Sequence, residues 1–93
     1  MQQNYSEAAK WFRLSAEQGD TVAQTSLGKM YYDGKGVKQD AVYAHMWWNF
    51  AASLGNKISV KARDKYSKSM TPSQLKEARR LASACAQKNY KGC

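Results

Sequence analysis

Two short motifs in this sequence could carry nucleophilic chemistry. Ser26-Leu27-Gly28-Lys29 and Ser73-Gln74-Leu75-Lys76 each place a lysine three residues after a serine. In penicillin-recognising enzymes this Ser-x-x-Lys pattern supplies the nucleophile, and Ser-Asp-Asn and Lys-Thr-Gly motifs accompany it. Neither companion motif occurs here. A penicillin-interacting hydrolase is therefore a remote alternative, and we expect the chain not to be an enzyme.

The other residues that could do acid–base, metal or nucleotide chemistry are isolated. His45 is the only histidine, and no carboxylate stands at a helical spacing where it would orient the ring. His45, Cys85 and Cys93 are too few and too scattered for a zinc site. Gly34-Lys35-Gly36 lacks the residues that complete a phosphate-binding loop. The sequence therefore predicts no metal site and no cofactor.

The two cysteines, Cys85 and Cys93, can be interpreted in two ways. Cys85 falls on the apolar stripe of the last expected helix, and Cys93 follows Gly92, which can turn the tail back. A bond between them would stabilise the fold by about 2–3 kcal/mol through loop entropy; the alternative is a buried thiol and a free terminal thiol. We predict a Cys85–Cys93 disulfide, which favours a periplasmic or secreted location over the cytoplasm.

A series of lysines marks a candidate binding surface. It repeats at i, i+4, i+8 and i+11, which is one face of a helix, and consists of Lys57, Lys61, Lys65 and Lys68. The positions 36 residues earlier are Thr21, Thr25, Lys29 and Tyr32. We hypothesise that the two sets form one inner strip that contacts a partner. The alternative is that the lysines only solvate an exposed face.

The net charge of +8 is confined to one half of the chain. Residues 56–93 hold ten basic and two acidic residues, whereas residues 1–55 hold five of each. This imbalance favours an acidic protein or peptide partner. The alternative is a polyanion or RNA, with aromatic residues as stacking platforms for bases. The four candidates for stacking have helical spacing, which favours packing in the core instead: Trp11, Phe12, Trp47 and Trp48.

The elements that position these residues follow from an internal repeat. With a shift of 36 residues, Trp11 overlays Trp47 and Gly19 overlays Gly55. A period in this range is typical of stacked helix pairs. Residues suited to helix N-caps are Asp20, Asp40, Asn56 and Thr71, the last followed by Pro72 and Gln74. We therefore expect five helices, over about residues 5–18, 21–32, 41–54, 57–69 and 72–88.

Each expected helix carries an apolar stripe at spacings of three and four residues. The stripes are Ala8, Trp11, Phe12 and Ala16; Ala23, Leu27, Met30 and Tyr31; Ala44, Trp47, Trp48 and Ala52; Ile58, Ala62 and Tyr66; and Leu75, Ala78, Leu81, Ala82 and Cys85. No segment has the alternation of a strand, and none is long and apolar enough to enter a membrane. The sequence predicts an all-α fold with these stripes in the core. One tryptophan of the Trp47–Trp48 pair is expected to expose an edge.

The pattern Ala8-x-x-Trp11-Phe12-x-x-Ser15-Ala16-Glu17-Gln18-Gly19-Asp20 resembles the Sel-1-like repeat. Its continuation also does: Ala23-Gln24-x-x-Leu27-Gly28-x-Met30-Tyr31-x-x-Gly34-x-Gly36-Val37. The resemblance covers roughly residues 5–62. It implies a tetratricopeptide-like solenoid, a right-handed superhelix of antiparallel helix pairs. It also implies a non-enzymatic adaptor for protein–protein contact, with Gly28 allowing close approach of helices and Val37 plugging the core.

The resemblance also divides the chain, which we take as a single domain over residues 1–93. Residues 5–19 are the second half of a first repeat, residues 20–55 are one full repeat, and residues 56–93 are a partial repeat with a C-terminal capping helix. Because the first repeat lacks its leading helix, the aromatic side of the first helix is expected to be poorly covered. A homodimer through this helix is a further hypothesis.

Overall fold

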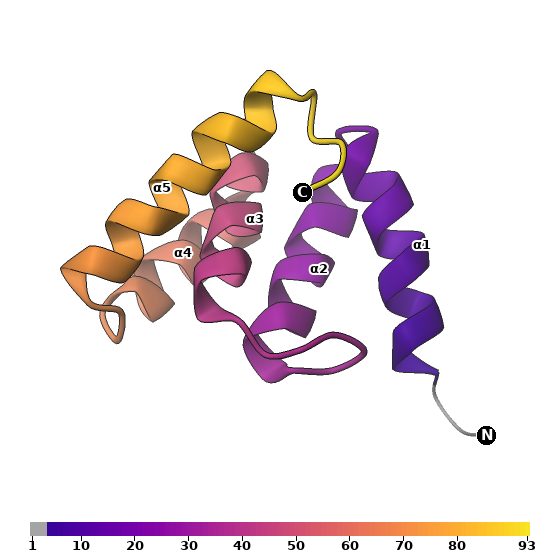
Figure 1. Cartoon of the computed structure of the whole chain (residues 1–93), viewed down its shortest axis with the longest axis horizontal. Helices are drawn as coiled ribbons and strands as arrows, with labels where there is room; N and C mark the ends of the chain where they lie inside the picture. Colours follow the sequence, from indigo (N-terminus) through magenta and orange to yellow (C-terminus); the bar gives the residue numbers. More distant parts are fainter. Residues whose placement is uncertain (1–3) are drawn as a thin grey trace.

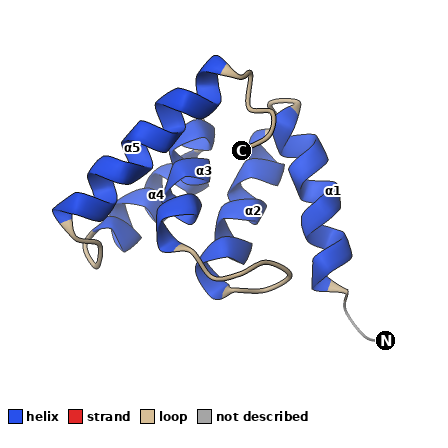
Figure 2. Cartoon of the chain, viewed as in Figure 1, coloured by secondary structure: helices blue, strands red, loops and turns tan. Residues whose placement is uncertain are grey.

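The computed structural model describes residues 4–93 and contains five α-helices (Figure 1). They are α1 (Tyr5–Glu17), α2 (Thr21–Asp33), α3 (Ala41–Ser53), α4 (Lys57–Ser67) and α5 (Pro72–Gln87). The described residues form no strand (Figure 2). The predicted all-α fold and the five predicted helices are confirmed, with α4 ending two residues earlier than expected.

Local capping residues set where the helices begin and end. The Asp20 carboxylate accepts hydrogen bonds from the amides of Val22 and Ala23, and the Asp40 carboxylate accepts one from Tyr43. Thr71 and Gln74 form a reciprocal capping box at the start of α5. Because these bonds join residues close in sequence, the starts of the helices could be predicted without knowledge of the tertiary structure.

The helices stack side by side, with α1 at one end and α5 at the other (Figure 1). Helix α3 is the central element, since it packs against α2, α4 and α5. Helix α1 packs against α2. This order places the N-terminal and C-terminal helices on opposite flanks of a shared core, in which α3 is the most completely surrounded element.

The core forms around the two adjacent tryptophans of α3. Trp47 and Trp48 are both fully buried. A side chain at position 28 would place its Cβ 2.5 Å from Nε1 of Trp48, so glycine is required there for α2 to approach α3. The predicted role of Gly28 is confirmed. Val37 packs against the core from the α2–α3 loop, as expected.

Three predictions about burial are wrong, whereas the expected poor cover of the aromatic side of the first helix is confirmed by Trp11. Trp11 is 65% exposed and Ile58 is 69% exposed, although both fall on stripes assigned to the core. Trp11 lies on the face of α1 that points away from α2, and no described helix covers it. Ile58 borders an open groove beside α4. The expected exposed edge of the Trp47–Trp48 pair is also absent, because α3 is enclosed by its neighbours.

The C-terminal tail bridges the two ends of the molecule. Cys85 and Cys93 lie at disulfide-bonding distance, with Cα atoms 5.8 Å apart, as the predicted bond requires. The fold then turns the tail toward α1 (Figure 1). There Arg13 donates to the carbonyl of Cys93 at 3.0 Å, and the amide of Gly92 donates to the Glu17 carboxylate at 3.1 Å. The cysteine pair therefore secures a tail that contacts α1.

Candidate binding groove

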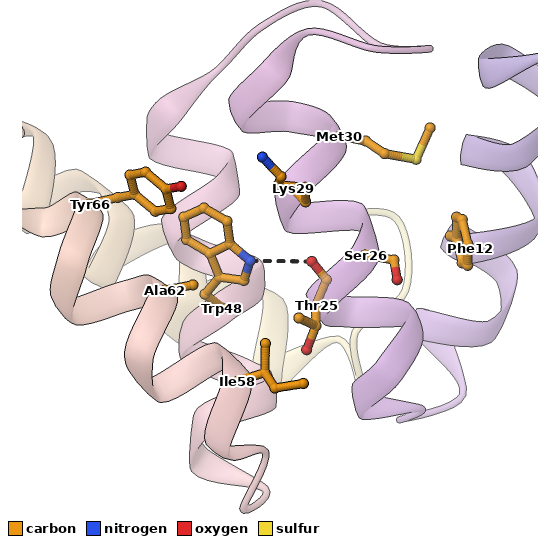
Figure 3. Close-up of a pocket in the computed structure, with 9 residues that line it drawn as sticks. All are labelled: Phe12, Thr25, Ser26, Lys29, Met30, Trp48, Ile58, Ala62 and Tyr66. Carbon is orange, nitrogen blue, oxygen red and sulfur yellow. Dashed lines mark hydrogen bonds between the residues drawn. The ribbon is translucent and has the colours of Figure 1, made fainter.

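An open groove of about 470 Å³ lies between α2 and α4. Side chains from four helices line it: Phe12 of α1; Thr25, Ser26, Lys29 and Met30 of α2; Trp48 of α3; and Ile58, Ala62 and Tyr66 of α4 (Figure 3). Most of these side chains are apolar. The groove is therefore suited to take up an apolar side chain of another molecule.

Stacked aromatic rings form one wall of the groove. The rings of Trp48 and Tyr66 are stacked, with centroids 5.2 Å apart. The ring centroids of Tyr32 and Tyr66 are 4.2 Å apart. Nε1 of Trp48 donates to the carbonyl of Thr25 at 3.2 Å, which fixes the orientation of the indole (Figure 3). Because the rings are held by one another and by this bond, the wall is preorganised for binding.

Polar contacts join α2 to α4 at one end of the groove. The hydroxyl groups of Thr25 and Ser59 are 2.6 Å apart, and the side-chain amide of Asn56 donates a hydrogen bond to the Thr21 hydroxyl at 3.3 Å. Ser59 is fully buried. Thr21 and Thr25, which we had placed on the partner-facing strip, therefore also hold the two helices together.

The other strip residues of α2 lie beside the aromatic wall. Lys29 lines the groove and pairs with the Asp33 carboxylate at 3.1 Å. This hydrogen bond raises the pKa of Lys29 above its usual value, so the ammonium group stays charged at neutral pH. Tyr32 is half-buried against Tyr66. The structure thus brings Thr25, Lys29 and Tyr32 to one region.

The three lysines of α4 and its C-cap residue Lys68 are exposed, and none of them lines the groove. Lys65 is nearest to it, with Nζ 5.4 Å from the centroid of the Tyr66 ring. Lys57, Lys61 and Lys68 are on the part of α4 that does not form the groove wall. The groove itself is made by residues that we had assigned to core stripes, above all Ile58, Ala62 and Tyr66. The sequence did contain a signal for these groove residues. The apolar stripes of successive repeats face each other, so the stripe of α4 could have been expected to face that of α2.

The Ser-x-x-Lys motifs do not form a nucleophile–base pair. Ser26 and Lys29 both line the groove, but Lys29 is paired with Asp33 and its pKa is raised, whereas a lysine base needs a lowered pKa. Ser73 and Lys76 are exposed at the start of α5. His45 is buried and faces a separate cavity beyond α4.

Residues 4–93 contain neither a cluster of metal ligands nor a helix that could span a membrane. No group of three or more histidine, cysteine or acidic side chains is close enough to hold a metal ion. None of the described helices combines the length and the hydrophobicity needed to cross a membrane.

Comparison with known proteins identifies the repeat. The Sel1 repeat model matches residues 1–20 and 21–56. No curated protein matches the chain in sequence. The fold is similar to the crystal structure of a protective antigen present in uropathogenic Escherichia coli strains that displays an SLR fold, with a TM-score of 0.83 and 33% sequence identity. The match covers 92% of this chain but 20% of the antigen, so the chain spans about a fifth of that protein's length.

These two matches agree with each other and with the all-α solenoid described above. Repeats of this type are generally protein–protein interaction modules, and they are typically scaffolds without enzymatic activity. The chain belongs to the Sel1 repeat family.

Proposed function

We propose that this chain is a non-enzymatic adaptor that binds an acidic segment of a partner protein in the groove between α2 and α4. The observation that supports this most is the groove itself. Apolar and aromatic side chains line it, Lys29 adds a charge, and no described segment of the chain fills it. A large apolar side chain of the partner enters between Met30, Ile58 and Tyr66. Burial of such a side chain contributes about 1.5–3 kcal/mol to binding.

The charge around the groove supports an acidic partner. Lys29 and Lys65 lie at its edges, and Lys61 is exposed on the same helix as Lys65. Exposed lysines near an interface increase the rate of association with an acidic segment more than they increase affinity. The apolar groove then accounts for affinity, and the lysines account for the choice of an acidic sequence.

Selection from a phage-displayed library of random peptides tests the proposal. We expect peptides that bind the wild type to combine acidic residues with a large apolar residue. Ile58→Glu should weaken their binding about tenfold or more, since it places a charge beside the apolar groove. The matched control is Val22→Glu, because Val22 occupies the equivalent position one repeat earlier, is equally exposed and does not line the groove. Equal binding by both variants would refute the proposed site.

A second pair of variants tests the role of charge. Lys61 and Lys65 changed together to Glu should slow association with the selected peptides and reduce its dependence on salt. Lys38 and Lys76 changed together to Glu give the same net charge away from the groove and should have a smaller effect. If instead an oligouridylate binds the wild type with a steep salt dependence and displaces the peptides, the polyanion alternative is favoured.

We also propose that two copies associate through the outer face of α1. Trp11, Leu14, Glu7 and Lys10 border a surface hollow there, and the two apolar residues are exposed. In an antiparallel pairing Glu7 of each copy can face Lys10 of the other, so the surface is complementary to itself. Sedimentation equilibrium should show a dimer that Trp11→Glu abolishes. A monomeric mass for the wild type at high concentration would contradict this.

A further inference from the structure

A second cavity, of about 310 Å³, lies on the other side of α4 from the groove. Helices α3, α4 and α5 border this cavity, which is open to solvent, and its lining is mostly polar, with two arginines: His45, Asn49, Arg63, Asp64, Ser67, Leu75 and Arg79. It shares no residue with the groove. Its volume is near the lower end of the range for small-molecule sites, which is about 300–1,000 Å³.

Two arginines from different helices contribute unused donors to this cavity. Arg63 is paired only through Nε, which lies 3.3 Å from the Asp64 carboxylate, so both terminal nitrogens of its guanidinium remain available. Arg79 forms no ion pair or side-chain hydrogen bond within the described residues, in contrast to Arg80, which pairs with Glu77. A guanidinium group has donors arranged to bind two oxygens of an oxyanion at once.

His45 contributes a third donor. It is 6% exposed, and its Nδ1 lies 3.2 Å from the amide nitrogen of Asn49. In the neutral ring with the Asn49 side-chain NH₂ as donor, Nδ1 accepts and the proton lies on Nε2. Nε2 has no hydrogen-bond partner among residues 4–93. The ring is therefore held in an orientation that leaves one N–H group for a ligand.

The charges around His45 indicate the sign of that ligand. Burial lowers the pKa of His45, and Arg63 and Arg79 lower it further, whereas Asp64 opposes them. Asp64 also lines the cavity, but its side chain is 65% exposed, so solvent screens its charge more than it screens a buried one. The field inside the cavity is consequently positive, and an anion that enters it would interact favourably with all three donors.

We propose that this cavity binds a phosphate group, either as inorganic phosphate or as the phosphate of a small phosphorylated molecule. Donors arrive from three helices instead of in one plane, which suits a tetrahedral group with three or four oxygens better than a planar carboxylate. The two negative charges of a phosphate dianion also balance the positive charges of the two arginines. The site is independent of the groove and adds a second binding function to the adaptor.

The single histidine provides a specific test by NMR. The His45 ring resonances are followed as sodium phosphate replaces sodium chloride at constant ionic strength, which keeps non-specific screening equal. Phosphate should raise the pKa of His45 relative to chloride and give a saturable shift. Arg79→Gln should weaken binding about tenfold or more. The matched control is Arg80→Gln, which removes the same charge one residue away and should bind as the wild type does.

Two further probes define the ligand. Phosphoserine that binds as tightly as inorganic phosphate supports a phosphorylated molecule as the ligand, and tighter binding of inorganic phosphate supports the free ion. Acetate should bind at least about tenfold more weakly than phosphate, since it forms fewer charge-assisted hydrogen bonds. The proposal is overturned if chloride and phosphate give the same His45 titration, if acetate equals phosphate, or if Arg79→Gln and Arg80→Gln behave alike. Far-UV circular dichroism verifies that both variants are folded.

Discussion

Helices α1 and α3 carry the same sequence pattern in opposite environments. Trp11 and Trp47 are separated by one repeat, yet Trp11 is 65% exposed and Trp47 is 0% exposed. Leu14 and Phe50 show the same contrast, at 54% and 5%. Helix α3 is packed between α2, α4 and α5, whereas α1 contacts α2 and the C-terminal tail.

The difference between α1 and α3 shows that an apolar helix face and a buried helix face are two separate properties. The pattern determines which face of a helix is apolar, and the neighbouring repeat determines whether that face is covered. The apolar face of α3 thus contributes stability, whereas the equivalent face of α1 is available for contact with another surface. The α2–α4 groove arises in the same way, since Ile58 is apolar and has no cover.

The largest expected effect comes from truncating the buried tryptophan. Trp47→Ala should lower the free energy of unfolding by about 3–5 kcal/mol, because it leaves a cavity in the centre of the core. Trp11→Ala should change it by about 0.5 kcal/mol or less, as is usual for an exposed side chain. Urea denaturation followed by circular dichroism measures both. Equal losses would show that the two helices are covered alike.

Removing the cysteine pair should have the next largest effect. Cys93→Ser should lower the free energy of unfolding by about 2–3 kcal/mol, since the unfolded chain regains the entropy of the closed loop. It should also loosen the tail that contacts Arg13 and Glu17 of α1. Hydrogen exchange should therefore increase in α1 more than in α3. If reduction of the wild type changes neither stability nor exchange, the pair does not hold the tail.

A smaller effect is expected at the glycine of α2. Gly28→Ala should cost about 1–3 kcal/mol, because the new Cβ would overlap the buried indole of Trp48. The equivalent residue in α4 is Asp64, whose side chain is mostly exposed. Asp64→Ala is the control and should change the free energy of unfolding little. A Gly28→Ala protein as stable as the wild type would mean that α2 and α3 are farther apart than described.

The smallest expected effect is a pH dependence of the unfolding free energy. It arises from His45 of α3 and has no counterpart in α1. His45 and Ala9 are equivalent positions and both are buried. Because the pKa of His45 in the folded protein lies below its usual 6.5, the unfolded chain binds more protons as the pH falls through that value. The contribution of His45 to stability is thus complete above its unfolded pKa and is lost toward lower pH. His45→Ala should reduce the slope of unfolding free energy between pH 7 and pH 5, measured by urea titration at about ten millimolar salt.

Features set by residues close in sequence were predictable. Asp20, Asp40 and Thr71 form hydrogen bonds with amides two or three residues away, so sequence alone located the helix starts. The spacing of Ala23, Leu27 and Tyr31 identified the buried side of α2. The position of Cys85 on a buried stripe also allowed its proximity to Cys93 to be anticipated.

Features set by helices that meet only in three dimensions were not predictable. Periodicity assigned Ile58 to the core, because a stripe contains no information about which element covers it. It assigned Trp11 to the core as well, and only the division into repeats predicted the poor cover of that side of α1. The cavity around His45 combines Arg63 of α4 with Arg79 of α5, and no local motif links them. Lys61 and Lys68 share a helix face, but the sequence could not show that neither of them lines the groove.

Tryptophan fluorescence tests the contrast between α1 and α3 most directly. The chain has three tryptophans, and only Trp11 is exposed. In a Trp11→Phe protein the emission comes from Trp47 and Trp48, so it should be shifted to shorter wavelength and be only weakly quenched by acrylamide. At a concentration at which the chain is monomeric, the wild type should show an additional, readily quenched component from Trp11. If the Trp11→Phe protein is quenched as strongly as the wild type, the tryptophans of α3 are open to solvent and the account of a covered α3 and an open α1 is wrong.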